Sequence, residues 1–403
     1  MAAGEAAERN ASASGAGAGV GAGGAGATAS APWDYRQPVE LHFGCGRRFE
    51  LGQSVAQRGW QRGLLVTSAG FAKRGTAAEL AACCEGRIVA TYAEVSPNPT
   101  VQECDACVAL IRRHRCDFVV ALGGGSAMDC AKAAANISQG PHSAAACLAD
   151  LSLLPATSLP VVALPTTAGT ASEVTRVAVL SDHATGVKSP IRNDVLYPKL
   201  AIVDPELTFT VPQHTTASSG IDALCHAIEG YWSRGHLPVT DALAPAAISR
   251  ILTNLEIVCA EPENQEARTR MAEASMLAGL VFSAPGTTAP HACSYPLTNL
   301  LGIVHGEACA LTLPYFLQLN AAHDAEGRID ALARAVGFAD AAAFGARIVE
   351  LKAQVGLASD LRAYNVDDAM LERLVEGSQN STLANNPVPV DAALLRDVFE
   401  QLR

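Results

Sequence analysis

The sequence lacks any concentrated run of basic residues. Its 29 lysines and arginines are outnumbered by 40 aspartates and glutamates, which gives a net charge of −11 at pH 7. Binding of nucleic acid needs a basic face that neutralises phosphates, and no motif that reads a groove is present either. We therefore exclude nucleic acid as a partner.

Long hydrophobic runs are also missing. No apolar stretch reaches about 18 residues without a charge, so the sequence predicts no transmembrane helix and no membrane partner. Residues 1–32 are rich in Ala, Gly and Ser, with neither a basic start nor a Leu-rich middle. This composition is typical of a disordered tail rather than a signal peptide, and we leave it out of the predicted fold.

Cysteines are present without the dense spacing of a disulfide scaffold. The 12 cysteines are scattered along the chain, and Cys104 and Cys107 form one C-x-x-C pair with no second pair to complete a zinc site. Scattered cysteines favour a reducing compartment, so we expect a cytoplasmic protein. The remaining composition, 49% hydrophobic and 17% charged, is typical of a globular enzyme.

The chain of 403 residues suits two domains. Over residues 33–205, short apolar runs alternate with helical patterns, which predicts an α/β nucleotide-binding domain with a parallel sheet. Over residues 206–403 the strand signals end and helical periodicity dominates, which predicts an all-α domain. The predicted strands are VELHF, GLLVTS, RIVATYAEV, DFVVALGGG, PVVALPTTAG and LAIVDPE.

Two loops of small residues follow predicted strands. In DFVVALGGGSAMDCAKAAA, residues 117–135, an apolar strand runs into three glycines and then a helix, an arrangement that can bind a diphosphate through free backbone N–H groups. In PTTAGTASEVT, residues 165–175, hydroxyl side chains follow another strand. Each loop alone could be an ordinary turn. Both should lie at the carboxyl edge of the sheet, where nucleotides bind.

One carboxylate and three imidazoles form the third candidate group. Asp222 and His226 are four residues apart in GIDALCHAIEG, so they share one face of an apolar helix, where an unpaired charge is costly. His291 and His305 follow in the same domain, fourteen residues apart. A divalent transition metal would compensate the buried carboxylate. From spacing alone, any single histidine among the three is more often an ordinary core or surface residue than a ligand.

At these segments the sequence resembles the iron-containing, or group III, alcohol dehydrogenases, from about Tyr35 to the C-terminus. GGGSAMDCAK is similar to the family pattern GGGSxxDxxK, PTTAGTASEVT to PTTxGTGSEVT, and GIDALCHAIEGYWS to GxDALxHAIExYxS. The resemblance implies a dehydroquinate synthase-like architecture and metal ligands at Asp222, His226, His291 and His305. It also implies cofactor contacts at Asn98, Gly124, Gly125, Ser126, Asp129, Thr166, Thr167, Thr175 and Lys188.

Three positions depart from the family pattern. Tyr295 stands where many members carry a further histidine near the metal, and a phenol there could still donate a hydrogen bond. Ser68 replaces the aspartate that binds the adenosine ribose in NAD-preferring members, which favours NADPH or acceptance of both cofactors. Ala171 replaces a glycine, which matters if that residue needs a positive φ.

The resemblance implies a metal-dependent oxidoreductase that transfers a hydride between NAD(P)H and a small alcohol or aldehyde. We expect an aldehyde reductase that uses Fe²⁺, Zn²⁺ or another divalent ion and forms a homodimer. Phosphonoacetaldehyde reductases and hydroxyacid-oxoacid transhydrogenases are the alternatives within the family, and a catalytically silent nucleotide- or metal-binding module is the alternative outside it. Arg176, Arg192 and Lys199 are either contacts for an anionic substrate or solvated surface charges.

Overall fold

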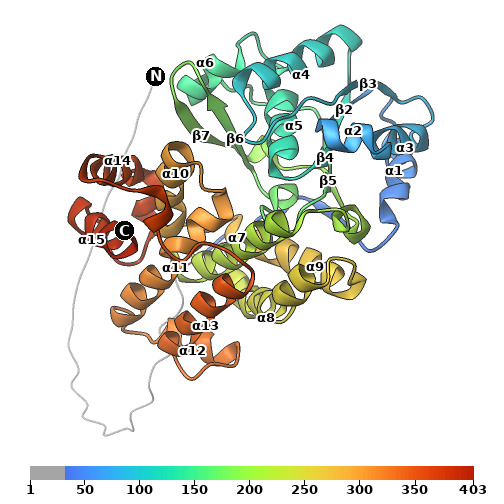
Figure 1. Cartoon of the computed structure of the whole chain (residues 1–403). Coiled ribbons are helices and arrows are strands. Elements are labelled where there is room, and N and C mark those ends of the chain that lie inside the picture. The colour runs from blue at the N-terminus through green and yellow to red at the C-terminus, as the bar shows by residue number, and fades with distance from the viewer. Residues whose placement is uncertain (1–31) are drawn as a thin grey trace, which may run out of the picture. The chain divides into compact units, whose positions relative to one another are not determined.

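The computed structural model describes residues 32–403, so the predicted tail lies outside the described residues apart from Pro32. Residues Tyr35–Arg403 form one compact unit. Within this unit, strands and helices alternate as far as Val203, and only helices follow (Figure 1). The predicted fold class is confirmed: a parallel-sheet N-terminal domain precedes a helical C-terminal domain.

The six predicted strands form one parallel sheet in the order β1-β8-β5-β4-β2-β3. Its central strands are buried on both faces, as expected when helices cover both sides of a parallel sheet. The direction of strand addition reverses after β3, and such a switch point is where open α/β sheets bind ligands. The strands are β1 (Glu40–Phe43), β2 (Gly63–Thr67), β3 (Ile88–Tyr92), β4 (Phe118–Gly123), β5 (Val161–Pro165) and β8 (Leu200–Val203).

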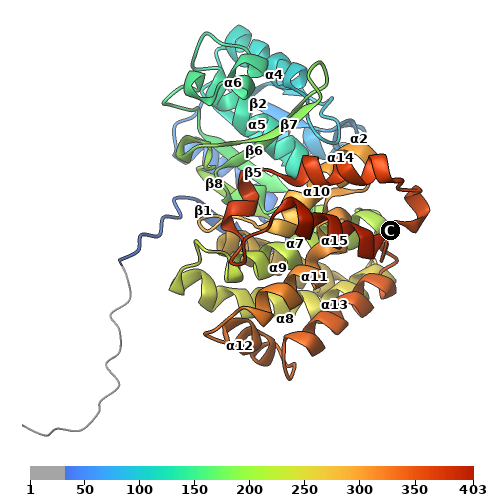
Figure 2. The same cartoon turned by 90° about the vertical axis from the view of Figure 1, so that its left-hand side faces the viewer.

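Helices pack on both faces of this sheet (Figure 2). Val120 packs in one cluster with Leu51 of α1 and Leu80 of α3, whereas its neighbours Val119 and Ala121 pack in another cluster with α4 and α5. The alternation follows from the two-residue period of a strand. The helices of this domain are α1 (Leu51–Gln57), α2 (Ala69–Lys73), α3 (Thr76–Cys83), α4 (Val101–His114), α5 (Gly125–Ile137) and α6 (Ala144–Ala149).

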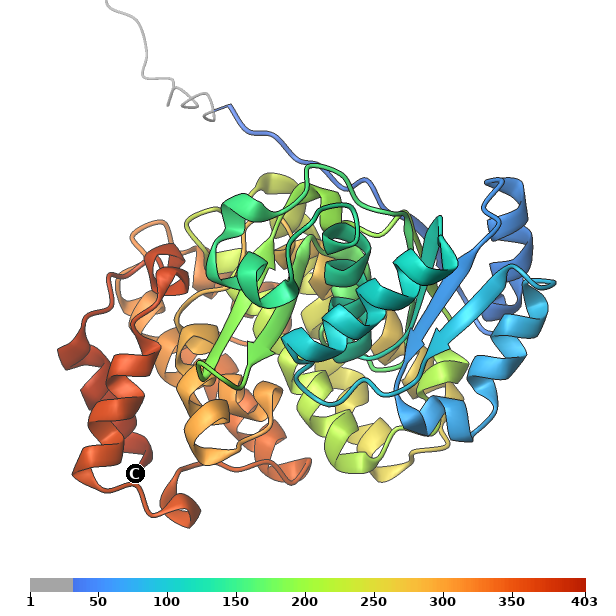
Figure 3. The same cartoon turned by 90° about the horizontal axis from the view of Figure 1, so that it is seen from above.

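An antiparallel hairpin is the element that the sequence did not predict. Strands β6 (Val177–Asp182) and β7 (Val187–Arg192) pair with each other and not with the main sheet. Figures 1 and 3 show this hairpin, in light green, beside α5 and the orange helix α10 (Ala289–Leu301). Lys188 and Arg192 both lie on β7, so the hairpin carries two of the charged residues considered above.

The C-terminal domain is built around α7, whose buried residues include both halves of the Asp222–His226 pair. The helical periodicity predicted for residues 206–403 is borne out by long helices such as α8, α9 and α13. The elements of this domain are η5 (Pro205–Thr208), α7 (Gln213–Trp232), α8 (Pro238–Ala260), α9 (Gln265–Phe282), α10, α11 (His305–Ala322), α12 (Arg328–Ala335), α13 (Ala341–Gln354), α14 (Asp368–Ser378), η7 (Ser381–Asn385) and α15 (Ala392–Leu402).

Helix α8 is long and apolar enough, by length and composition, to cross a membrane. It contains Asp241, Arg250 and Glu256, and residues such as Ile248 and Ile251 pack in the hydrophobic core of the helical domain. A core helix of this kind passes the same test, so this one helix is weak evidence for a membrane segment.

Candidate metal and cofactor site

Helix α7 presents two potential ligands on one buried face. Asp222 is 2% exposed and His226 is 5% exposed, and their side chains lie one turn apart, with 3.9 Å between Asp222 Oδ2 and His226 Nδ1. The helix is long, and apart from Glu229 most of its remaining buried positions are apolar or small, which fixes this face against the core. Burying a carboxylate here requires a compensating partner.

Two more imidazoles reach the same point from other helices. His291, on α10, places Nε2 3.6 Å from Asp222 Oδ1, and His305, the first residue of α11, places Nε2 3.9 Å from the same oxygen. The Nε2 atoms of His226 and His291 are 3.0 Å apart. The structure therefore brings together the four side chains that the sequence singled out.

A glycine allows α11 to approach α7 closely enough for this. A Cβ atom on Gly306 would lie 2.0 Å from the carbonyl oxygen of Ser218 and 2.7 Å from Asp222 Cβ. Any larger residue would push α11 away, and with it His305. This is a place where the site depends on the absence of a side chain.

The carboxylate of Asp222 has an unsatisfied oxygen. Its Oδ1 is buried and has no hydrogen-bond partner among the described residues, although three ring nitrogens lie around the group. A buried carboxylate oxygen without a donor is costly unless a cation occupies the position. A divalent cation therefore fits this donor set, which combines one carboxylate with imidazole nitrogens.

The pKa values of His226 and His305 indicate that these two rings have lone pairs available. Burial lowers the pKa of His226 to about 4 and that of His305 to about 3, against the opposing attraction of Asp222. Both rings are thus neutral at pH 7. Burial also opposes protonation of His291, but the charge and hydrogen bond of Glu229, together with Asp222, raise its pKa.

Each imidazole is held by a partner on Nδ1, and the sequence analysis missed these partners. Glu229 Oε1 lies 2.6 Å from His291 Nδ1, and the carbonyl oxygen of Gly169 lies 3.3 Å from His226 Nδ1. A partner that accepts from Nδ1–H leaves the Nε2 lone pair free for a metal. The signal for Glu229 was in the quoted helix, seven residues after Asp222 and on the same face.

Ser294 is the corresponding partner of His305. Its hydroxyl donates to the carbonyl oxygen of His291 at 2.7 Å, so its oxygen accepts from His305 Nδ1 at 3.3 Å. His305 consequently also has Nε2 free on the side of Asp222. His291 and His305 thus have Nε2 toward the carboxylate. In His226 the nitrogen near Asp222 is Nδ1, 3.9 Å from Oδ2, and its Nε2 lies 3.0 Å from His291 Nε2.

Cys309 is a further side chain near this cluster. Asp222, His291, His305 and Cys309 offer ligand atoms that lie within 4.8 Å of one another, and Cys309 Sγ is 3.9 Å from His305 Nε2. Burial raises the pKa of the Cys309 thiol well above its usual value. His226 is not one of these four residues, but its neutral ring would need no deprotonation to bind a cation, unlike the Cys309 thiol.

The glycine turn lies at the carboxyl end of β4, where α5 begins. A Cβ on Gly124 would lie 3.1 Å from Thr167 Oγ1, and one on Gly125 would lie 2.9 Å from Thr170 Cγ2. The two loops predicted to bind the nucleotide are thus in contact with each other. The free N–H groups at the start of α5 favour a phosphate here.

Three of the other predicted cofactor residues form a hydrogen-bonded chain beside this turn. Asn98 N donates to Ser126 Oγ at 3.2 Å, and Lys188 Nζ donates to Asn98 Oδ1 at 2.9 Å. Burial lowers the pKa of Lys188, while Cys309, Asp129 and Asp222 oppose this shift. Lys188 therefore lies between the glycine turn and the Asp222 cluster.

The loop from Pro165 to Thr175 connects the two halves of the site. Thr166 is 2% exposed and begins the loop beside Gly123, and Thr167 contacts the glycine turn. A Cβ on Gly169 would lie 2.6 Å from Ser219 of α7. Ala171 has φ 50° and ψ 31°, so the family's glycine is replaced by alanine at a left-handed position.

Two predicted cofactor residues are engaged with the protein itself. The carboxylate of Asp129 accepts from Ser172 Oγ at 2.5 Å and from Val179 N at 2.9 Å. Thr175 is 3% exposed, and its Oγ1 lies 3.4 Å from Lys132 Nζ. These contacts tie α5 to the hairpin and the loop. Asp129 and Thr175 thus support the walls of the site.

Ser68 and Tyr295 lie on separate elements, one after β2 and the other on α10. Ser68 follows β2, which neighbours β4, and its side chain makes no capping hydrogen bond with α2. Tyr295 lies one turn after His291 on α10, where burial raises the pKa of its phenol to about 12, with Cys309 adding to the shift and Arg192 opposing it. The phenol remains a hydrogen-bond donor at neutral pH.

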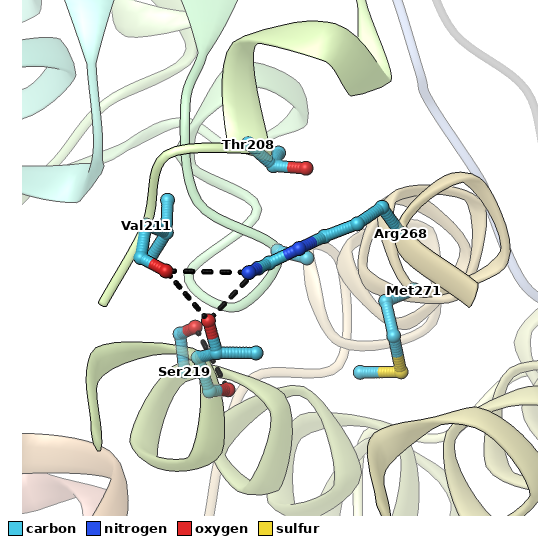
Figure 4. A pocket seen from close by; sticks show the side chains of 7 residues that line it. Thr208, Val211, Ser219, Arg268 and Met271 are labelled. Atoms are coloured by element: carbon cyan, nitrogen blue, oxygen red, sulfur yellow. Dashed lines mark hydrogen bonds between the residues drawn. The ribbon is translucent and has the colours of Figure 1, made fainter. Parts of the chain in front are cut away.

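A separate small pocket lies where α9 meets α7 and the segment after η5 (Figure 4). Its one charged side chain, Arg268, already donates to Thr216 Oγ1, Val211 O and Pro262 O. With its nitrogens bonded to the protein, this arginine supports the packing of α9. The pocket is not the candidate active site.

Comparisons with known proteins agree with this geometry. Residues 38–205 match the model "Iron-containing alcohol dehydrogenase", and residues 216–402 match "Fe-containing alcohol dehydrogenase family, C-terminal". The chain belongs to the iron-containing alcohol dehydrogenase family. It is therefore a metal-dependent oxidoreductase that transfers a hydride between a nicotinamide cofactor and an alcohol or aldehyde. The predicted family, enzyme class and cofactors are confirmed.

Relatives within this family cover nearly the whole chain. Long-chain-alcohol dehydrogenase 1 of Geobacillus thermodenitrificans is 35% identical over 90% of this chain and 95% of its own length. 1,3-Propanediol dehydrogenase of Klebsiella pneumoniae is 34% identical over 91% and 98%. The solved structure of sulfoacetaldehyde reductase from Bifidobacterium kashiwanohense with NAD⁺ is 45% identical, with a TM-score of 0.89 over 93% and 99%.

Proposed function

We propose that the protein reduces a short aldehyde with NAD(P)H, using a divalent metal held by Asp222, His226, His291 and His305. The observation that carries this proposal is the buried Asp222 Oδ1, which has no hydrogen-bond partner among the described residues while His291 Nε2 and His305 Nε2 lie 3.6 and 3.9 Å away. When bound, the metal supplies Lewis-acid polarisation of a carbonyl, and the nicotinamide supplies the hydride.

The protein's own residues orient these partners. Glu229, Ser294 and the Gly169 carbonyl hold the three rings through Nδ1, which leaves the three Nε2 atoms free. The glycine turn at the start of α5 receives the diphosphate, with Asn98, Ser126 and Lys188 beside it. The hydroxyl of Tyr295 stays protonated at neutral pH and can donate a hydrogen bond to the substrate oxygen, whose negative charge grows during reduction.

The test is consumption of reduced nicotinamide by purified protein loaded with Fe²⁺ or Zn²⁺. We expect NADPH or NADH to be oxidised in the presence of short aldehydes, and protein stripped by a chelator to be inactive until metal is restored. The relatives' names range over long-chain alcohols, 1,3-propanediol and sulfoacetaldehyde, so the panel should include neutral and acidic aldehydes. Binding of metal and cofactor without turnover of any of them would favour a silent binding module.

Cofactor choice should depend on Ser68. It follows β2, where the family's NAD-preferring members carry aspartate, and it has no charge to repel a 2′-phosphate. We expect Ser68→Asp to lower the ratio of kcat/KM for NADPH to kcat/KM for NADH by about 10-fold or more, because a carboxylate repels the extra phosphate. Ser68→Asn, which adds similar volume without charge, is the control. An unchanged ratio in Ser68→Asp would show that this position does not read the 2′ group.

Two further parts of the proposal concern assembly and location. A homodimer is proposed from the family resemblance, and light scattering on the purified protein would test it. A cytoplasmic location is supported by the 12 cysteines, all of which lie in the described part of the chain and are free.

A further inference from the structure

Strand β7 presents two cations on one face beside the cluster. Lys188 and Arg192 are four residues apart in the same strand, so their side chains point the same way, while Ile191 points into the core. Lys188 is hydrogen-bonded to Asn98 and interacts with the charge of Asp222. Arg192 lies about 13 Å further along the strand, on the side of α10.

The guanidinium of Arg192 has no carboxylate partner among the described residues. It is exposed, yet enough protein surrounds it for desolvation to lower its pKa, helped by Arg176. Among the described residues no carboxylate forms an ion pair with Arg192, whereas Tyr295 and Tyr197 oppose the shift. The neighbouring Asp194 is bound by Arg176 at 2.5 Å and by Arg36 at 3.4 Å. Arg192 is thus recessed, accessible and available to an anion.

The guanidinium end of Arg192 lies against Gly286, in the segment that leads into α10. A Cβ on Gly286 would be 3.5 Å from its Nη1 atom. Gly286 is in the short segment between Phe282, whose ring stacks on His226 at 3.9 Å, and Thr288, whose N–H donates to Glu229 at 2.7 Å. The charge of Arg192 also interacts with Tyr295, which lies one helical turn from His291.

We propose that Arg192 binds the anionic head group of the substrate, which makes the substrate class short aldehydes that carry a sulfonate, phosphonate or carboxylate. This proposal rests on the proposed aldehyde reduction and names the residue that sets its specificity. The planar fork of a guanidinium matches two oxygens of such a head group, and an interaction with a charged partner in a recessed position is strong. Arg176 is already paired, and Lys199 is exposed on the segment before β8.

The experiment compares kcat and KM for propanal with those for sulfoacetaldehyde, phosphonoacetaldehyde and 3-oxopropanoate. We expect the wild-type protein to prefer an acidic aldehyde. Arg192→Gln should lower kcat/KM for that aldehyde by about 10- to 100-fold, mainly through KM, and leave propanal within about threefold. The kcat/KM of Arg192→Lys for the acidic aldehyde should lie between those of the wild type and Arg192→Gln, because lysine keeps the charge and loses the planar fork. Lys199→Gln, which removes an equal charge from an exposed position, should leave kcat/KM unchanged for both kinds of aldehyde.

The possible outcomes test the role of Arg192 separately from the proposed aldehyde reduction. Equal losses for propanal and the acidic aldehydes in Arg192→Gln would overturn the role of Arg192, as would a wild-type preference for propanal. In both cases the aldehyde reduction itself would stand. Failure of the wild-type protein to reduce any aldehyde would instead contradict the proposed function. The three acidic aldehydes also distinguish a monoanionic head group from a dianionic one.

Discussion

Replacing Asp222 by Asn should abolish tight metal binding while leaving the metal-free protein at least as stable as the wild type. Asp222 is 2% exposed, and its Oδ1 has no hydrogen-bond partner among residues 32–403. Without a metal this carboxylate costs stability, because no donor replaces the water it lost. Asparagine removes that charge. It also removes the one anionic ligand, so the stabilisation by metal should disappear.

The magnitude follows from the number of ligands. A site of four ligands that binds a divalent ion with about 10–16 kcal/mol owes about 2.5–4 kcal/mol to each ligand. Losing one ligand should therefore weaken binding by about 100- to 1,000-fold. Competition with a chromophoric chelator measures the affinity, and thermal unfolding with and without metal measures the stabilisation. Activity should fall in proportion to metal occupancy.

Asp204 provides a matched control for this change. It is buried as deeply, at 1% exposure, but its oxygens accept from Arg48 at 2.9 Å and from the N–H groups of Gly46 and Glu206 at 3.1 Å. Asp204→Asn should lower the free energy of unfolding by about 2 kcal/mol or more and leave metal affinity unchanged. Wild-type metal affinity in Asp222→Asn would contradict the ligand assignment, whatever its effect on stability.

The sequence predicted the parts of this protein that repeat a regular pattern. Apolar strands separated by helices gave the parallel sheet, and the four-residue spacing placed Asp222 and His226 on one face. His291 and His305 lie on different helices, so spacing alone could not join them, and the family resemblance was needed. The β6–β7 hairpin was not predicted, because a strand containing Pro190 and a turn containing Gly186 interrupt the alternation of strands and helices.

Other features could not be predicted because they depend on contacts between distant segments. The partner of His226 is a backbone carbonyl, which every residue possesses, so no residue type marks it. Arg176 and Arg192 look equivalent in the sequence. Only the folded chain shows that Asp194 neutralises Arg176 and leaves Arg192 without a carboxylate. Asp129 has the residue type of a ligand-binding group, yet its oxygens hold Ser172 and the hairpin.

Replacing Glu229 by Gln should weaken metal binding by reversing the tautomer of His291. Glu229 is fully buried. Its Oε2 accepts from Thr288 N at 2.7 Å and from Thr288 Oγ1 at 3.0 Å, while Oε1 lies 2.6 Å from His291 Nδ1. Because the two Thr288 donors require an oxygen, the amide NH₂ of glutamine must face His291. It would donate to Nδ1, so the ring proton would move to Nε2 and block the lone pair that faces Asp222.

We expect this variant to bind metal about 10- to 100-fold more weakly than the wild type, a smaller loss than in Asp222→Asn, because the ligand itself is retained. Nitrogen NMR of the His291 ring should show the proton on Nδ1 in the wild type and on Nε2 in the variant. Glu307→Gln makes the same change at a buried glutamate that accepts from Ala358 N at 2.7 Å, and it should lower stability without altering the tautomer. A reversed tautomer with wild-type metal affinity would exclude His291 Nε2 as a ligand. The tautomer and the affinity must therefore change together if Glu229 holds this ring for the metal.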